Sequence, residues 1–145
     1  MVFMILSVLS GIPASGKSTL SKQLADKYNA KRYCFDDIPE SRNSKKSRQA
    51  HHKFWDDISK DLTFQNVVCD DLNVTIETRQ LLLEHLSDVE CRKIIYVMTT
   101  PLEECLKRNN GRQGIERLPE IVIRSLHSIF ELPTLSEGWD EIIYI

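Results

Sequence analysis

Residues 11–18 read Gly-Ile-Pro-Ala-Ser-Gly-Lys-Ser and fit the spacing G-x-x-x-x-G-K-S. We expect Gly11 and Gly16 to adopt backbone angles that a Cβ would forbid, so that successive N–H groups point at one anion. Lys17 would then reach the β- and γ-phosphates of a nucleotide, and the hydroxyl of Ser18 would bind Mg²⁺. The spacing therefore predicts a site for a nucleoside triphosphate and its metal.

The surroundings of this octet are those that a phosphate-binding loop requires. An apolar run at 3–9 precedes it as a buried strand would, and the helix-compatible stretch 17–28 follows. The start of that helix adds unpaired N–H groups and a positive dipole end to the same site. The residues expected to hold the nucleotide here are Gly11, Ala14, Ser15, Gly16, Lys17, Ser18 and Thr19.

Two pairs of aspartates follow strand candidates, Asp36-Asp37 after 31–35 and Asp70-Asp71 after 66–70. Phosphoryl transfer to an alcohol needs a carboxylate near Mg²⁺ and a carboxylate that accepts the hydroxyl proton. Acids also begin turns and cap helices, but two such pairs favour the chemical interpretation. We therefore expect Ser18, Asp36 and Asp70 at the metal.

Apolar runs alternate with helix-like stretches along the whole chain. Strands are expected at about 3–9, 31–35, 66–70, 93–98 and 141–145, and helices near 17–28, 47–62, 75–87, 101–109 and 118–130. This alternation predicts an α/β fold with a five-stranded parallel sheet and helices on both faces. In such sheets the ligand binds at the carboxyl edge of the strands, where the aspartate pairs would lie.

A basic segment follows the fourth strand candidate and contains Arg108, Gly111, Arg112 and Gly114. Because Arg108 and Arg112 are four residues apart, a helix end would project both on one face. We expect a lid at about 108–118, with the glycines as hinges and the arginines facing the transferred phosphate. A solvated basic helix end is the alternative.

Composition limits the class of protein. The chain has 145 residues and a net charge of −2, which fits one domain over 1–145 without a general attraction to nucleic acid. Its four cysteines form no C-x-x-C pair, which favours reduced thiols in the cytoplasm and suggests no metal site of their own. No segment is long enough to span a membrane, and the apolar start is interpreted as a strand.

Several stretches taken together resemble the 5′-polynucleotide kinase-like branch of P-loop kinases and the related seryl-tRNA kinases. They are, in chain order, residues 11–19, 35–37, 70–73 with Arg79, 101–109 with Arg112, and 133–141. The stretch Phe-Asp-Asp-Ile-Pro at 35–39 is closer to the seryl-tRNA kinases. At 71–73 Leu72 replaces the hydroxyl residue of the family's Asp-Thr-Asn element. The resemblance implies a P-loop kinase fold, ATP and Mg²⁺.

The resemblance also implies roles for individual residues. Asp36 matches the general base, and Arg79 matches an arginine near the acceptor and the transferred phosphate. Arg108 and Arg112 match the lid, where they would contact ATP. The groups implied to catalyse transfer are Lys17, Asp36, Arg79 and Arg112. Those expected to bind the acceptor are Asp36, Asp37, Arg42, Asp71, Asn73 and Arg79.

A locally basic stretch at 42–53 follows the expected base and precedes Phe54 and Trp55. Its charges could hold the phosphates of a nucleic acid, whereas the two aromatic side chains more simply pack a helix onto the sheet. We therefore expect a kinase acting on the 5′-hydroxyl end of RNA or DNA. The alternatives are a kinase for another alcohol, such as seryl-tRNA, a nucleoside or a small metabolite, and an accessory protein that hydrolyses ATP without a phosphorylated product.

Overall fold

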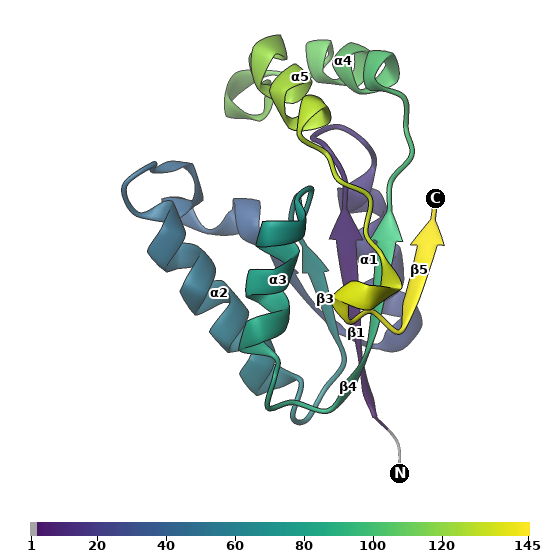
Figure 1. The fold of residues 1–145 in the computed structure, drawn as a ribbon. Helices are drawn as coiled ribbons and strands as arrows, with labels where there is room; N and C mark the ends of the chain where they lie inside the picture. Colours follow the sequence, from purple (N-terminus) through teal and green to yellow (C-terminus); the bar gives the residue numbers. More distant parts are fainter. Residues whose placement is uncertain (1–2) are drawn as a thin grey trace.

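The computed structural model describes residues 3–145, and within them five strands form one parallel sheet in the order β2-β3-β1-β4-β5. The strands are β1 (Met4–Ser10), β2 (Lys31–Cys34), β3 (Val67–Asp70), β4 (Cys91–Val97) and β5 (Glu141–Tyr144). Residues 1 and 2 of the expected domain lie outside the described part. The α/β class and the five-stranded parallel sheet are confirmed, and the carboxyl ends of all strands lie at one edge (Figure 1).

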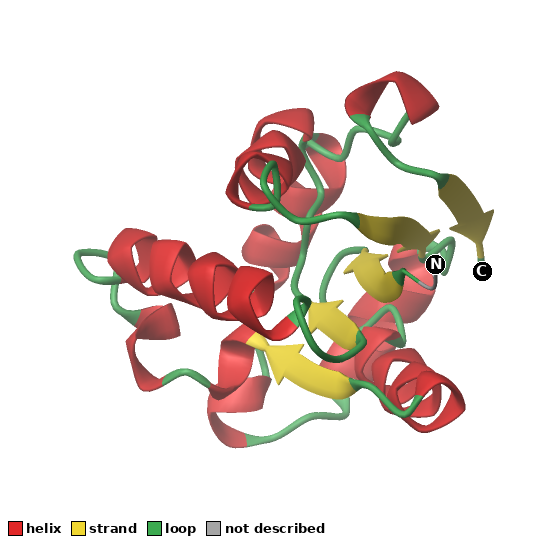
Figure 2. Cartoon of the chain, turned by 90° about the horizontal axis from the view of Figure 1, so that it is seen from below, coloured by secondary structure: helices red, strands yellow, loops and turns green. Residues whose placement is uncertain are grey.

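Helices cover both faces of this sheet, as Figure 2 shows in the view along it. They are α1 (Lys17–Tyr28), α2 (Ser47–Asp61), α3 (Ile76–His85), α4 (Leu102–Asn110) and α5 (Glu120–Ser128). In Figure 1, α2 and α3 lie in front of the sheet, α1 lies behind it, and α4 and α5 lie above its carboxyl edge. Short 3-10 helices that the sequence did not predict are η1 (Phe35–Asp37), η2 (Pro39–Arg42), η3 (Gly114–Glu116) and η4 (Leu135–Glu137).

The central strands carry apolar runs, such as 67–69 of β3 and 94–97 of β4, that helices bury on both faces. On one face, Phe54, Trp55 and Ile58 of α2 pack on Leu6 and Val8 of β1. The packing interpretation of Phe54 and Trp55 is thereby confirmed. On the other face, Leu24 of α1 packs with Leu9 of β1 and Val68 of β3.

A separate apolar cluster joins α4 and α5 to the loop after β1. Ile12 and Ala14 of that loop pack with Cys105, Leu106 and Ile123 of the two helices, all of them buried. The helices above the carboxyl edge are thus anchored directly on the predicted phosphate loop. No helix within residues 3–145 combines the length and the apolar character needed to cross a bilayer.

Candidate active site

The predicted phosphate loop connects β1 to the first turn of α1. Gly16 precedes the helix with φ 101°, and Ala14 has φ 65°, so the backbone turns through left-handed conformations. Gly11 does not need such an angle, which corrects the sequence interpretation. Close packing requires glycine at position 11, because a Cβ there would lie 2.8 Å from Ser15 Oγ and 2.9 Å from the Met98 side chain.

The loop offers donors that match the phosphates of a nucleotide. Within residues 3–145 the buried hydroxyl of Ser15 has no hydrogen-bond partner, and no side chain caps the first turn of α1. Lys17 Nζ donates to Ile12 O at 3.0 Å, which holds the ammonium group inside the loop. Thr100 Oγ1 donates to Ser15 O at 2.8 Å and ties the loop to the segment after β4. This donor set fits a triphosphate.

The electrostatics of Lys17 show which charges lie near it. Burial lowers the pKa of Lys17 below its usual value. Negative charge from Asp70, Asp71 and Asp36, in decreasing order, partly opposes this shift, and Arg112 reinforces it. These three of the four predicted aspartates therefore lie near enough to Lys17 to act on its charge, and Asp37 is not among them.

Asp70 is held by neighbours from two other elements. Its buried Oδ2 accepts hydrogen bonds from Ser21 Oγ of α1 and from Arg32 Nη2 of β2, both at 2.8 Å. Arg32 also donates through Nε to Ser21 Oγ at 2.6 Å, and its Nη2 lies 3.5 Å from Ser18 Oγ. Ser18 is exposed, and hydroxyl and carboxylate oxygens are the ligands that Mg²⁺ prefers, so Ser18 and Asp70 fit the predicted metal.

Asp36 and Asp37 are both exposed on η1, at the end of β2. Phe35 anchors this turn, because its buried ring stacks on His51 at 3.5 Å between centroids and 8° between planes. Asp37 Oδ2 lies 3.9 Å from Arg32 Nη1. An exposed carboxylate beside Lys17 is the arrangement that a base for an incoming hydroxyl requires.

Asp71 has a partner that the sequence did not suggest. His51 Nε2 lies 2.7 Å from Asp71 Oδ2, and the His51 ring lies between the rings of Phe35 and Trp55. Asp71 Oδ1 also accepts from the N–H of Leu72 at 2.8 Å. His51 sits twenty residues away in a basic stretch, so only the packing of α2 against the end of β3 brings the two together.

Asn73 is not placed where an acceptor could reach it. Its side chain is buried and donates to Leu9 O at 2.9 Å, and its φ is 48°. Its carbonyl accepts from Ser10 Oγ at 2.8 Å and from Arg79 Nη1 at 3.0 Å. Asn73 therefore fixes the turn after β3 against the end of β1, in place of the predicted contact with substrate.

Arg79 is likewise placed in the interior, with 0% of its surface exposed. Its Nε donates to Glu137 Oε1 at 2.8 Å and its Nη2 to Glu137 Oε2 at 3.3 Å, so the contact is bidentate. Burial raises the pKa of Glu137, but hydrogen bonds from Arg79 and from the N–H of Thr134 outweigh that effect and hold the pKa below its usual value. Arg79 thus joins α3 to η4 and does not face the acceptor as the resemblance implied.

The two arginines of the predicted lid are positioned differently: one belongs to α4 and the other follows it. Arg108 Nη1 is 3.4 Å from Ala14 O, and Arg108 Nε pairs with Glu104 at 3.3 Å. Arg112 follows the end of α4, so the two arginines do not share one helical face, which corrects the prediction. Gly111 has φ −82°, an ordinary helical angle, whereas Gly114 has φ 65°. Only Gly114 has the backbone expected of a glycine-dependent turn.

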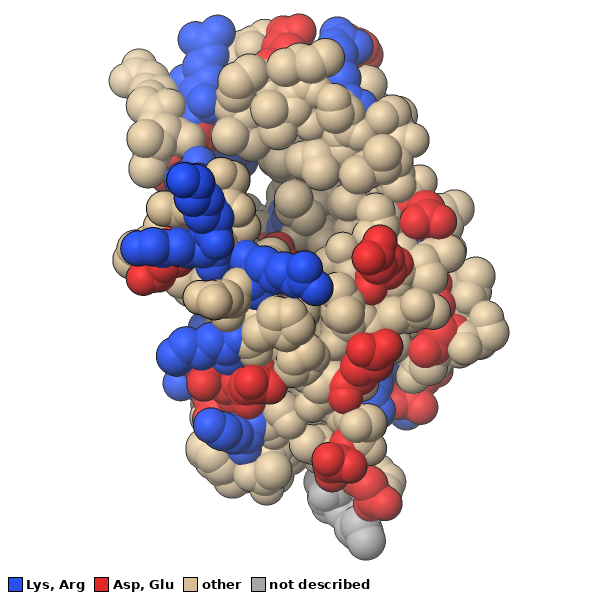
Figure 3. All heavy atoms as spheres, turned by 60° about the vertical axis from the view of Figure 1, so that its left-hand side comes forward, with Lys and Arg blue, Asp and Glu red and all other residues tan. Residues whose placement is uncertain are grey.

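The exposed basic side chains of 42–53 gather beside a hollow on one face of the molecule (Figure 3). These residues, called the basic patch below, are Arg42, Lys45, Lys46, Arg48 and Lys53. Arg42 Nη1 donates to Ile115 O at 3.1 Å and so links the patch to the segment between α4 and α5. Arg42 is thus the residue of the patch that contacts the predicted lid.

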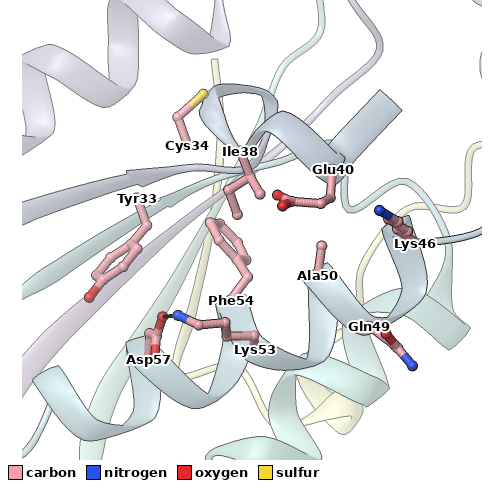
Figure 4. Close-up of a pocket in the computed structure, with 10 residues that line it drawn as sticks. All are labelled: Tyr33, Cys34, Ile38, Glu40, Lys46, Gln49, Ala50, Lys53, Phe54 and Asp57. Atoms are coloured by element: carbon pink, nitrogen blue, oxygen red, sulfur yellow. Dashed lines mark hydrogen bonds and ion pairs between the residues drawn. The ribbon is translucent and has the colours of Figure 1, made fainter. Parts of the chain in front are cut away.

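A cavity of about 470 Å³ lies between β2, Ile38 and η2 on one side and α2 on the other (Figure 4). Its lining includes the aromatic rings of Tyr33 and Phe54 and the basic side chains of Lys46 and Lys53. Within the described residues, neither the phosphate loop nor Asp36 lines it. The cavity thus lies on the side of the basic patch and is separate from the phosphate loop.

Comparison with known proteins agrees with this geometry. The family model of the chromatin associated protein KTI12 matches residues 4–143. The chain is 30% identical over 141 residues to the bifunctional polynucleotide phosphatase/kinase of Schizosaccharomyces pombe, covering 93% of this chain and 32% of that protein. It is 25% identical over 147 residues to the L-seryl-tRNA(Sec) kinase of Methanococcus maripaludis, covering 94% of this chain and 56% of that protein.

Among solved structures, Chaetomium thermophilum Kti12 in complex with ADP-AlF3 matches with a TM-score of 0.73 and 17% identity, covering 97% of this chain and 88% of that one. This likeness shows the fold. The chain spans about a third of the length of the first curated relative above and just over half of the second. The resemblance to polynucleotide kinase-like and seryl-tRNA kinase-like P-loop proteins that the sequence predicted is confirmed.

Proposed function

This chain belongs to the family of the chromatin associated protein KTI12, and from that premise we propose that it is an ATP-dependent phosphotransferase. The acceptor that we propose is the 5′-hydroxyl end of RNA or DNA. The observation that carries the proposal is the convergence of Asp36, Asp70 and Asp71 on Lys17, beside a loop whose donors fit a triphosphate.

The reaction follows from the positions of these groups. The loop amides and Lys17 bind the β- and γ-phosphates, and Arg108 and Arg112 add positive charge from the side of α4. Asp36 orients the acceptor hydroxyl and accepts its proton as the new O–P bond forms. The bond between the γ-phosphorus and the bridging oxygen breaks, and ADP leaves. Mg²⁺ held by Ser18 and Asp70 would neutralise phosphate charge when bound.

The acceptor class rests on the basic patch. Its side chains are exposed and gather on one face of the molecule, so they can hold the phosphates that follow a 5′ end. The match to a polynucleotide phosphatase/kinase supports the same class. Because each phosphate contact releases counterions, the apparent affinity for an oligonucleotide should fall steeply with salt, by a slope of about 0.7 per contact on single strands.

A second candidate is favoured by the family itself. The family description names chromatin association, and the Kti12 structure holds ADP-AlF3. The chain would then bind and hydrolyse ATP while docking a partner, without a phosphorylated product. The match to a seryl-tRNA kinase supports a different alternative, a kinase whose acceptor is carried on tRNA.

One assay separates these candidates. γ-Labelled ATP is offered with 5′-hydroxyl RNA and DNA oligonucleotides, bulk tRNA and a panel of small alcohols. We expect label on the oligonucleotides, a loss of about 10²–10⁴-fold in Asp36→Asn with ATP affinity retained, and no change in Asp88→Asn, an exposed aspartate outside the site. Label that passes only to water would establish the second candidate, and wild-type turnover by Asp36→Asn would remove Asp36 as the base.

A further inference from the structure

Arg32 of β2 contacts side chains of three other elements around the candidate site. From β2 it contacts Ser21 of α1 at 2.6 Å, Asp70 of β3 at 2.8 Å, and Asp37 of η1 at 3.9 Å. Its Nη2 also lies 3.5 Å from Ser18 Oγ. These contacts place one guanidinium between the groups that fit the metal and the turn that carries the proposed base.

Arg32 and the predicted metal site share the carboxylate group of Asp70 and lie next to the same hydroxyl of Ser18. Asp70 Oδ2 accepts from Arg32 Nη2, and Ser18 Oγ lies next to the same nitrogen. The side chain of Asp70 is only 7% exposed, so little water screens the charges around it. A divalent cation at Ser18 and Asp70 would therefore lie within a few ångströms of a guanidinium that cannot lose its proton. Repulsion between the two cations therefore favours release of Asp70 by Arg32 when that site fills.

Asp37 is the acceptor to which Arg32 can turn. Its Oδ2 is already 3.9 Å from Arg32 Nη1, and its side chain is 77% exposed and so free to close this gap. The side chain of Arg32 is itself 21% exposed, and the charged groups facing it are Asp70 and Asp37. Moving from one carboxylate to the other needs a small swing of the guanidinium and leaves no charge unpaired.

We propose that Arg32 is a positioning residue that exchanges Asp70 for Asp37 when Mg²⁺ and nucleotide bind. Because Asp37 follows Asp36 on η1, the exchange couples the filling of the metal site to the placement of the proposed base. This inference rests on the nucleotide site of the proposed function. It does not depend on which acceptor is used.

The test measures nucleotide binding and not transfer. A fluorescent ADP analogue is titrated against the protein over a range of Mg²⁺ concentrations, for the wild type, Arg32→Gln, Asp37→Asn and the double variant. Arg32→Gln should lower the Mg²⁺ concentration for half-maximal enhancement of binding about fivefold or more, because the competing cation is gone. Asp37→Asn should raise it about threefold in the wild type and leave it unchanged in the Arg32→Gln background.

Lys31→Gln is the matched control, because Lys31 is also a cation of β2 but pairs with Asp61 at 3.2 Å, outside this group of contacts. It should leave the Mg²⁺ dependence unchanged. If Arg32 were only a brace between α1, β2 and β3, Arg32→Gln would lower the thermal midpoint and shift affinity equally with and without Mg²⁺, which would overturn the proposal.

If Arg32→Gln does not fold, the variant Asp37→Asn, at an exposed side chain, tests the proposal by itself. Nucleotide binding by Asp37→Asn with an unchanged Mg²⁺ dependence would then refute the exchange. Absence of any binding by the wild type would instead refute the nucleotide site of the proposed function. Binding with an unmoved Mg²⁺ dependence refutes only the role of Arg32. The two failures are therefore distinguishable.

Discussion

Replacing Arg79 by Met should destabilise the fold without removing a substrate contact. The guanidinium has 0% exposure and makes a bidentate pair with Glu137 at 2.8 and 3.3 Å, plus a 3.0 Å hydrogen bond to Asn73 O. Met keeps the apolar stem but leaves the Glu137 carboxylate buried without its cation. Removing one partner of such a pair costs about 3–5 kcal/mol. For a domain of this size that corresponds to a fall in the thermal midpoint of about 10 °C or more.

The assay is thermal unfolding followed by calorimetry or circular dichroism, with nucleotide affinity measured well below the transition. Glu137→Leu alone should destabilise by a similar amount, and the double variant Arg79→Met/Glu137→Leu should recover part of the loss, because no charge then remains buried. ATP affinity of the folded Arg79→Met protein should stay within about twofold of the wild type. A midpoint within about 2 °C of the wild type, with transfer reduced a hundredfold, would refute this reasoning and restore the acceptor role.

Further predictions concern the phosphate loop and the pH dependence of stability. Lys17→Met should leave the thermal midpoint equal or higher, because burial of the ammonium opposes folding, while nucleotide affinity measured by calorimetry falls about 30-fold or more. Gly11→Ala should abolish nucleotide binding, since its Cβ would lie 2.8 Å from Ser15 Oγ. Gly114→Ala is the control: its Cβ would meet no atom within 4 Å, so this variant should strain a turn with φ 65° but retain binding. The pKa of Glu137 is lowered in the folded protein, so its contribution to stability is present above the unfolded pKa and is lost as the pH falls through the folded pKa. Urea unfolding below about pH 4.5 should show this loss of stability, and Glu137→Gln should make the free energy of unfolding less dependent on pH in this range.

Local sequence was enough to predict the frame of the site. The apolar runs of β1, β3 and β4 are buried on both faces, and that burial is what makes their sequence recognisable. The phosphate loop is likewise encoded in eight consecutive residues. Asp36 follows the end of β2 and Asp70 is the last residue of β3, so the rule that parallel strands end at one edge was sufficient to expect them at the same edge.

The partners inside the site could not be predicted in the same way. Arg79 and Glu137 are 58 residues apart, and Arg32 and Asp70 are 38 apart, with nothing in the local pattern of either to indicate pairing. An arginine six residues after Asn73 fits a family motif whether it faces substrate or the interior. Only the packing of η4 against α3 decides that Arg79 is enclosed, and η4 is a single short turn that periodicity does not reveal.

The most direct test of the account is a crystal structure with a non-hydrolysable ATP analogue and Mg²⁺. We expect the triphosphate in the loop of residues 11–18, with its γ-phosphate beside Lys17 and facing Asp36. An analogue bound elsewhere, or an Asp36 carboxylate turned away from a γ-phosphate held in the loop, would contradict the proposed phosphoryl transfer.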